Sequence, residues 1–210
     1  MFREFDIYRL MITVPAVLWA ISFHEFCHGY VAKLLGDPTA ERQGRLTLNP
    51  IKHFDPVGAL MLLFVGFGWA KPVPVNTRYF KHPRRDIFLV SLAGIAGNLL
   101  TAFTFVLIMR FVPQVFTNIT TILFIQIMIY INVGLASFNI LPIPPLDGSK
   151  VLSCFIPFKW LRGYYTFEQY GSYILLGLLI LSYMKINLLG FIMSPIFNFF
   201  LWLVGFTNWG

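Results

Sequence analysis

Residues 10–35 read LMITVPAVLWAISFHEFCHGYVAKLL, a largely apolar run that carries His24, Glu25 and His28 in its second half. A helix needs roughly 20 apolar residues to cross the hydrocarbon core of a membrane, and this run is long enough. The whole chain agrees, because 57% of its 210 residues are hydrophobic, 12% are charged and the mean hydropathy is +0.71. A soluble domain carries about twice that share of charged residues, so we expect a membrane protein.

Three further apolar runs approach or exceed spanning length, at residues 87–112, 119–141 and 188–206. Residues 173–184 reach that length only if their helix begins near residue 167. The flank before the first run has mixed charge and no small-residue cleavage site follows the run, so we expect a retained helix and not a signal peptide. Together the runs predict an all-α integral membrane protein, one domain over residues 1–210 with about five to six transmembrane helices.

The chain has a net charge of +7, but its basic residues lie in short loops between the apolar runs and not on one soluble face. We therefore expect no nucleic acid partner, since orientation in a membrane explains the charge better. The positive-inside rule places the two most basic stretches, residues 33–52 and 71–85, in the cytoplasm. Counting crossings from there, we expect a multi-pass protein of the cytoplasmic membrane with its amino terminus outside.

An apolar segment, residues 57–70, lies between these two basic stretches. If both flanks are cytoplasmic, the segment cannot cross the membrane once, and it is short for a spanning helix. A re-entrant or interfacial element fits, because irregular backbone at membrane depth is tolerated where protein or a water-filled cavity covers it. The alternative is a short crossing through a thinned bilayer.

His24 and His28 are four residues apart and Glu25 follows His24, which is the H-E-x-x-H pattern. Residues four apart share one helix face, so two imidazoles can bind one Zn²⁺ per chain; a third protein ligand then leaves one position for water. Glu25 is the candidate general base for that water. Ionisable side chains inside a membrane helix are costly unless they are paired or functional. The alternative is that these His and Glu side chains simply lie at a helix end that reaches the membrane–water interface, because Gly36-Asp37-Pro38 stops the helix soon afterwards.

Asp147 is the best candidate for the third ligand. It follows a proline-rich stretch, residues 142–145, which interrupts the returning helix near the cytoplasmic side and aims a side chain inward. The alternative for Asp147 is a capping role at the start of a helix near Ser149. The other candidates are Cys27, which more often packs as a small apolar residue, Asp55, and His53 and His82, which lie in basic loops where we expect them to be solvated.

Asn98 lies in the run at residues 87–112, where Gly94 and Gly97 allow close helix packing. A buried amide that simply satisfies its neighbours is the default interpretation. The functional interpretation is catalytic: Asn98 lies beside the metal and donates to the substrate carbonyl or to the oxyanion formed during attack.

These motifs together resemble the site-2 protease family of intramembrane zinc metalloproteases. The resemblance rests on residues 24–28, on Gly94-Ile95-Ala96-Gly97-Asn98 and on residues 139–148, and it covers about residues 22–152. It departs from the family pattern at Ile95, where proline is frequent, and at Cys27, where glycine or alanine is common.

The resemblance implies that the zinc ligands are His24, His28 and Asp147, that Glu25 is the general base and that Asn98 is a polar partner of the substrate. It implies a compact member without PDZ or CBS domains, with a catalytic core over about residues 8–152 and carboxyl-terminal helices over about residues 167–206. Such an enzyme is an endopeptidase whose partners are the lipid bilayer and a transmembrane protein or peptide substrate.

A membrane zinc transporter or a metal sensor without hydrolytic activity is the alternative that the residues leave open. Transport needs only ligands, whereas hydrolysis needs a base beside an open coordination position. The presence of Glu25 therefore distinguishes a hydrolase from a transporter or sensor. The active site of the protease is expected near the cytoplasmic side, since the helix that carries it ends there.

Overall fold

The computed structural model describes residues 7–65, 68–115 and 118–206, and in these ranges every regular element is a helix. Four helices are long: α1 (Ile7–Leu34), α5 (Pro83–Phe111), α6 (Ile119–Asn139) and α8 (Leu161–Tyr183). The shorter ones are α2 (Thr39–Arg42), α3 (Pro50–His53), α4 (Pro56–Val65), α7 (Asp147–Ser153) and α9 (Leu188–Leu203), with single 3₁₀ turns at Thr77–Tyr79, Pro113–Val115 and Phe158–Trp160. The all-α class predicted from the sequence is confirmed for the described residues.

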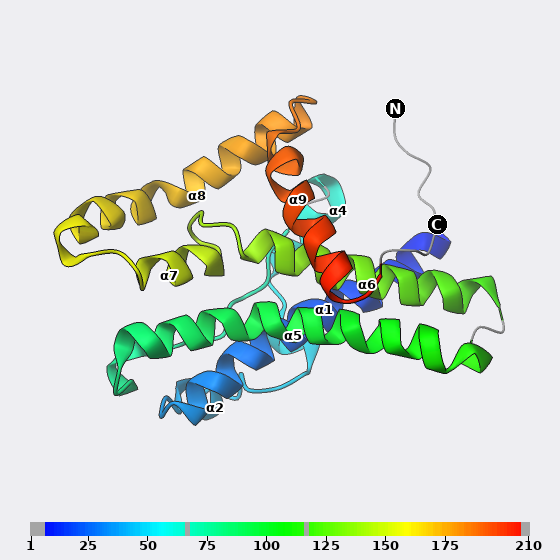
Figure 1. Ribbon diagram of the computed structural model, residues 1–210, viewed down its shortest axis with the longest axis horizontal. Helices are drawn as coiled ribbons and strands as arrows, with labels where there is room; N and C mark the ends of the chain where they lie inside the picture. Colours follow the sequence, from blue (N-terminus) through cyan, green and yellow to red (C-terminus); the bar gives the residue numbers. More distant parts are fainter. Residues whose placement is uncertain (1–6, 66–67, 116–117, 207–210) are drawn as a thin grey trace.

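The helices α1, α5 and α6 pack against one another and form the centre of the molecule (Figure 1). The largest apolar cluster joins α5, α6 and α9, and the side chains of Ala102, Ile129 and Val133 within it are fully buried. A small side chain such as that of Ala102 lets helix backbones approach closely. Helix α9 crosses α6, and α8 extends from the bundle toward the upper left of Figure 1. The three central helices therefore hold the side chains between them in fixed positions.

Three helices are long and apolar enough to cross a membrane, within residues 10–34, 83–111 and 119–139, and the bent pair α8–α9 adds a fourth if it counts as one span. The pair is bent by 98° at its break. Helix α9 has 16 residues, about 24 Å, and is shorter than the roughly 30 Å hydrocarbon core. These helices therefore form a multi-pass membrane protein. The expected total of five to six spans stays a prediction.

The segment at residues 57–70 is not one regular helix. Helix α4 covers ten residues, about 15 Å, which is half of what a crossing needs. Residues 66–67 lie outside the described ranges, and an extended segment without regular structure runs from residue 68 to residue 76. The guanidinium of the buried Arg45 holds this segment by donating to the carbonyls of Lys71 and Pro72, at 2.7 and 3.2 Å.

Helix α6 ends at Asn139, and the chain turns through the prolines before α7 begins at Asp147. Gly148 makes this turn possible, because a Cβ atom at that position would lie 2.0 Å from the carbonyl oxygen of Ile140. The side chain of Asp147 makes no capping hydrogen bond to α7. The N-cap residue of α7 is Leu146, and no side chain caps the helix there. The turn therefore delivers Oδ2 of the Asp147 carboxylate to the two histidines of α1.

We expect Gly148→Ala to destabilise the protein by about 1–3 kcal/mol, the usual cost of forcing extra volume into a packed site. The midpoint of thermal unfolding in detergent measures the effect. Gly163→Ala is the matched control: Gly163 lies in α8, a Cβ there meets nothing within 4 Å, and alanine favours a helix. Equal midpoints for the two variants would contradict the close approach at Gly148.

Candidate metal centre

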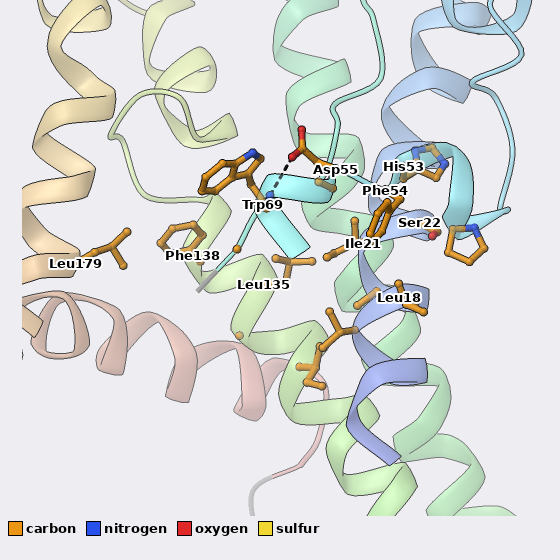
Figure 2. A pocket seen from close by; sticks show the side chains of 18 of the residues that line it. Leu18, Ile21, Ser22, His53, Phe54, Asp55, Trp69, Leu135, Phe138 and Leu179 are labelled. Carbon is orange, nitrogen blue, oxygen red and sulfur yellow. Dashed lines mark hydrogen bonds between the residues drawn. The ribbon is translucent and has the colours of Figure 1, made fainter. Parts of the chain in front are cut away.

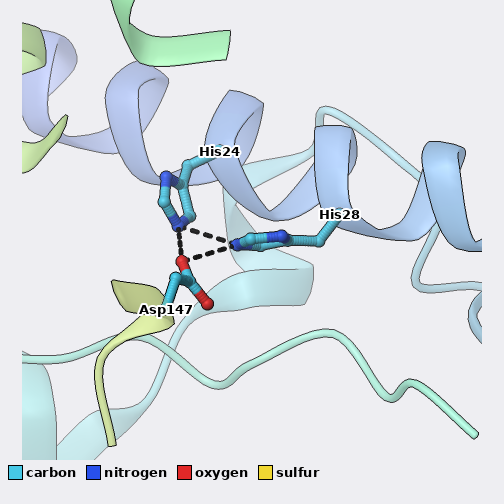
Figure 3. A group of neighbouring side chains, drawn as sticks. All are labelled: His24, His28 and Asp147. Carbon is cyan, nitrogen blue, oxygen red and sulfur yellow. Dashed lines mark hydrogen bonds and ion pairs between the residues drawn. The ribbon is translucent and has the colours of Figure 1, made fainter. Parts of the chain in front are cut away.

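Three side chains from two distant parts of the chain meet at one point (Figure 3). The Nε2 atoms of His24 and His28 lie 2.9 Å apart, and Oδ2 of Asp147 lies 3.1 Å from the first and 3.0 Å from the second. All three residues are buried, and among the described residues they are the one group of three possible ligands this close together. The structure thus brings together the three residues that the sequence nominated as zinc ligands.

The outer nitrogen of each imidazole is engaged by an acceptor. Nδ1 of His24 lies 2.6 Å from Oδ1 of Asn98, and Nδ1 of His28 lies 2.7 Å from the carbonyl oxygen of Val90. Since both partners are acceptors, both Nδ1 atoms carry the proton in the neutral rings. The two Nε2 atoms then present lone pairs to each other and to a carboxylate oxygen, an arrangement that only a cation makes favourable.

The donor set and its spacing fit zinc. Ligand atoms around tetrahedral zinc, at bonds of 2.0–2.1 Å, lie roughly 3.3 Å apart, close to the 2.9 to 3.1 Å spacings of this triangle. Two imidazoles and one carboxylate leave a fourth position open, as catalytic zinc sites require. The three residues could therefore hold a catalytic zinc ion.

The two oxygens of the Asp147 carboxylate have different neighbours. The Lys150 ammonium donates to Oδ1 of Asp147 at 3.1 Å, whereas Oδ2 faces the histidines. Lys150 therefore leaves one oxygen of the carboxylate for the metal.

Gly94 on α5 makes room for the cluster. A Cβ atom at this position would lie 2.5 Å from Nε2 of His28 and 2.7 Å from Nε2 of His24. Any side chain at residue 94 would occupy the space next to the two ligand nitrogens. Glycine here is required by the site and not only by close helix packing, which is the interpretation that the sequence alone favoured.

Glu25 lies in the same cavity as the three candidate ligands, a hollow of about 790 Å³ that also exposes Pro72 and Val73 of the extended segment. One carboxylate oxygen of Glu25 accepts a hydrogen bond of 2.7 Å from the backbone N–H of Val73. Pro72 and Pro74 have no N–H, so Val73 is the donor available in this stretch. The extended segment thereby fixes the position of the candidate base.

Asn98 differs from the expectation of a substrate contact. Its side chain is fully buried, its oxygen faces His24, and its amide N–H groups donate to the carbonyl of Ala20 at 3.0 Å and to Oδ1 of Asn132 at 2.9 Å. With both donors taken, the amide has none left for a substrate oxyanion in this conformation. The contacts of Asn98 orient the His24 ring.

The remaining ligand candidates lie elsewhere. Cys27 packs against Gly97, Asp55 accepts from the backbone of Gly58, and His82 stands at the start of α5. We expected His53 to be solvated, and this was wrong: it is 2% exposed and its Nε2 contacts the carbonyl of Thr47 at 2.8 Å. The supporting groups that sequence reasoning missed, at Val90 and Val73, are backbone atoms, which leave no signal in the sequence.

We expect Gly94→Ala to weaken zinc binding at least about 10-fold, the lower end of effects seen when groups around a metal site change. Zinc content of the purified protein and competition with a chelator measure the affinity. Gly177→Ala in α8, where a Cβ meets nothing within 4 Å, should bind zinc like the unsubstituted protein. Full affinity in Gly94→Ala would argue against a metal at the triangle.

The chain is similar in sequence to known proteins. Residues 113–184 match the model of peptidase family M50. The chain is 43% identical over 174 residues to a protein named as a zinc metalloprotease, YwhC of Bacillus subtilis (strain 168), covering 80% of this chain and 79% of that one. No solved structure matches the chain.

Two more distant relatives carry the same kind of name. Zinc metalloprotease MJ0611 of Methanocaldococcus jannaschii is 31% identical over 160 residues, which cover 76% of this chain and 78% of the relative. Zinc metalloprotease Rip2 of Mycolicibacterium smegmatis is 29% identical over 179 residues, covering 81% and 67%. These names favour hydrolysis over the transporter or sensor that the residues alone left open. The chain belongs to peptidase family M50, the site-2 proteases, and is a zinc metalloprotease.

Proposed function

We propose that this protein hydrolyses peptide bonds in or next to the transmembrane segments of other membrane proteins, and that His24, His28 and Asp147 hold its single zinc ion. The observation that carries the proposal is the position of the buried triangle. The triangle lies between helices of membrane-spanning length and opens into the cavity that contains Glu25. The catalytic core proposed for this reaction comprises about residues 8–152, with carboxyl-terminal helices at about residues 167–206, in one domain over residues 1–210.

The chain's own groups then have separate tasks. Bound zinc supplies a water of lowered pKa and polarises the carbonyl of the scissile bond. Glu25 accepts the proton of the attacking water and delivers it to the nitrogen of the leaving amine. The N–H of Val73 keeps the Glu25 carboxylate aimed into the cavity. Asn98 acts as a positioning residue, because it holds the ring of His24 through Nδ1.

A substrate helix has to unwind before its backbone can enter this cavity. Every N–H of a helix interior is already bonded within the helix, and the triangle is buried. Helix-destabilised membrane segments are therefore the substrate class that we propose.

The cleavage of a model transmembrane peptide by Glu25→Gln tests the assignment of the base. The amide keeps an oxygen for the Val73 N–H but cannot take up a proton, so we expect retained zinc and a rate at least about 100-fold lower, as general-base catalysis contributes 10²–10⁴. Glu168→Gln is the matched control, because Glu168 lines the same cavity and has no role in the proton transfer. Undiminished cleavage by Glu25→Gln would contradict the role of Glu25 as the general base.

We further propose five to six spans in the cytoplasmic membrane, with the amino terminus outside and residues 57–70 re-entering from the cytoplasmic side. The support is the number of basic residues on both flanks of that segment and the shortness of α4. The site then lies near the cytoplasmic surface, because α1 ends at Leu34, soon after His28.

Reporter fusions test this orientation. We expect fusions after Arg45 and after Lys81 both to report the cytoplasm, and a fusion after Gln114, between α5 and α6, to report the outside. Opposite sides for Arg45 and Lys81 would mean that residues 57–70 cross the membrane.

A further inference from the structure

Two cavities are lined by residues of α1, and they differ in the charge that they offer. The smaller one, of about 440 Å³, has a mostly apolar lining, and the described residues of that lining include no lysine or arginine (Figure 2). The metal cavity is different, because the side chains of Arg84 and Lys150 both line it. A negative charge that develops during hydrolysis therefore meets cationic side chains in the metal cavity.

The proposed reaction places such a charge on the carbonyl oxygen of the scissile bond. When water attacks the carbonyl carbon, the π electron pair of the C=O bond moves onto the oxygen. Donors held in place around that oxygen are usually the largest single contribution to the rate of such reactions. Asn98 was the candidate donor, but its N–H groups donate to Ala20 and Asn132. A donor from the protein therefore has to come from another side chain that lines the metal cavity.

Lys150 is the cation of this lining that contacts the metal triangle. Its Nζ donates to Oδ1 of Asp147 at 3.1 Å, while Oδ2 of the same carboxylate lies 3.1 and 3.0 Å from the two histidine Nε2 atoms. Lys150 and Asp147 are three residues apart in α7, so they share one helix face. Only the width of one carboxylate therefore separates the ammonium from the proposed metal site.

The ammonium of Lys150 keeps donors for a substrate. It has three N–H groups, one of which donates to Asp147, and no other partner of Nζ lies in the described part of the chain. The side chain is 52% exposed, and ion pairs that water reaches contribute little to stability. The contact with Asp147 holds the ammonium at the cavity wall, where the remaining N–H groups are free to bind an oxygen.

Arg84, the other cation of the lining, is held elsewhere. Its guanidinium donates to the carbonyl of Ile156 at 3.1 Å and lies over the ring of Phe158, 4.2 Å from the centroid. These contacts join α5 to the segment before α8. Arg84 is therefore occupied by the protein, whereas Lys150 is next to the reacting atoms.

We propose that Lys150 is a catalytic residue that donates a hydrogen bond to the carbonyl oxygen of the scissile bond and stabilises its negative charge; the inference rests on the proposed peptide-bond hydrolysis. Lys150 gives a hydrogen bond and keeps its protons. When the C–N bond breaks, the electron pair on the oxygen re-forms the C=O bond, and the amine leaves with the proton that Glu25 delivers. Lys150 thereby has the role that the sequence suggested for Asn98.

Cleavage of a model transmembrane peptide by Lys150→Met, with zinc in excess, tests the proposal. Methionine keeps an unbranched side chain but has no donor. We expect kcat to fall roughly 100- to 1,000-fold, the usual effect of losing one oxyanion donor. KM should stay nearly unchanged, because the hydrogen bond strengthens only as the charge develops. Lys150→Arg, which keeps a cationic donor, should recover most of the loss.

Lys159→Met is the matched control. It also removes one lysine charge, but Lys159 is exposed and does not line the metal cavity. Its kcat should equal that of the unsubstituted protein. An equal loss in Lys159→Met and Lys150→Met would mean that net charge, and not a donor at the site, is what matters.

A binding measurement without turnover separates this role from that of holding the metal. In a phosphinic peptide a tetrahedral, anionic group replaces the scissile amide. We expect this peptide to bind zinc-loaded Lys150→Met roughly 100-fold more weakly than the unsubstituted protein. The peptide with an intact amide should bind equally well to Glu25→Gln and to Glu25→Gln combined with Lys150→Met. Dissociation constants do not depend on the folded fraction of a variant.

Three results would overturn the proposal: an undiminished kcat in Lys150→Met, a loss of cleavage that added zinc reverses, or equal weakening of the two peptides. The second result would mean that Lys150 only helps Asp147 to hold the metal. If the unsubstituted protein cleaves no membrane peptide, the proposed function fails instead.

Discussion

Two imidazole nitrogens and a carboxylate oxygen within about 3 Å of one another are all acceptors, and this cluster is buried among apolar helices. Without a cation the cluster is unfavourable, because lone pairs face each other where water cannot separate them. The protons on the outer nitrogens are held by Asn98 and by the carbonyl of Val90, which prevents the rings from relieving the conflict by changing tautomer. The neighbouring structure therefore maintains a place for a metal ion.

The structure around the metal site lets polar groups reach it between closely packed helices. Gly94 removes the side chain that would fill the site, and Gly148 allows the chain after α6 to turn tightly enough to deliver Asp147. On the opposite side the extended segment contributes the N–H of Val73 to Glu25, and Arg45 holds that segment through two carbonyls.

Much of this architecture could be predicted from the sequence, since it follows from length, periodicity and spacing. The bounds of α1, α5 and α6 lie within a few residues of the apolar runs, and the H-E-x-x-H spacing together with the proline-broken helix nominated the triangle. The parts that were missed depend on long-range contacts. His53 reads as a loop histidine among basic residues, but it lies in α3, which packs against α1, and it is buried. Asn98 reads as a possible substrate donor, and only the positions of Ala20 and Asn132 reveal that its donors are taken.

Anomalous X-ray scattering from crystals of the zinc-loaded protein is the most direct test of a zinc ion between His24, His28 and Asp147. Data collected on both sides of the zinc absorption edge locate the ion without reference to the protein density. We expect one anomalous peak per chain, within bonding distance of Nε2 of both histidines and of Oδ2 of Asp147. A peak at another set of residues, for example at the thiol of Cys27, or no peak in protein that cleaves its substrate, would contradict it.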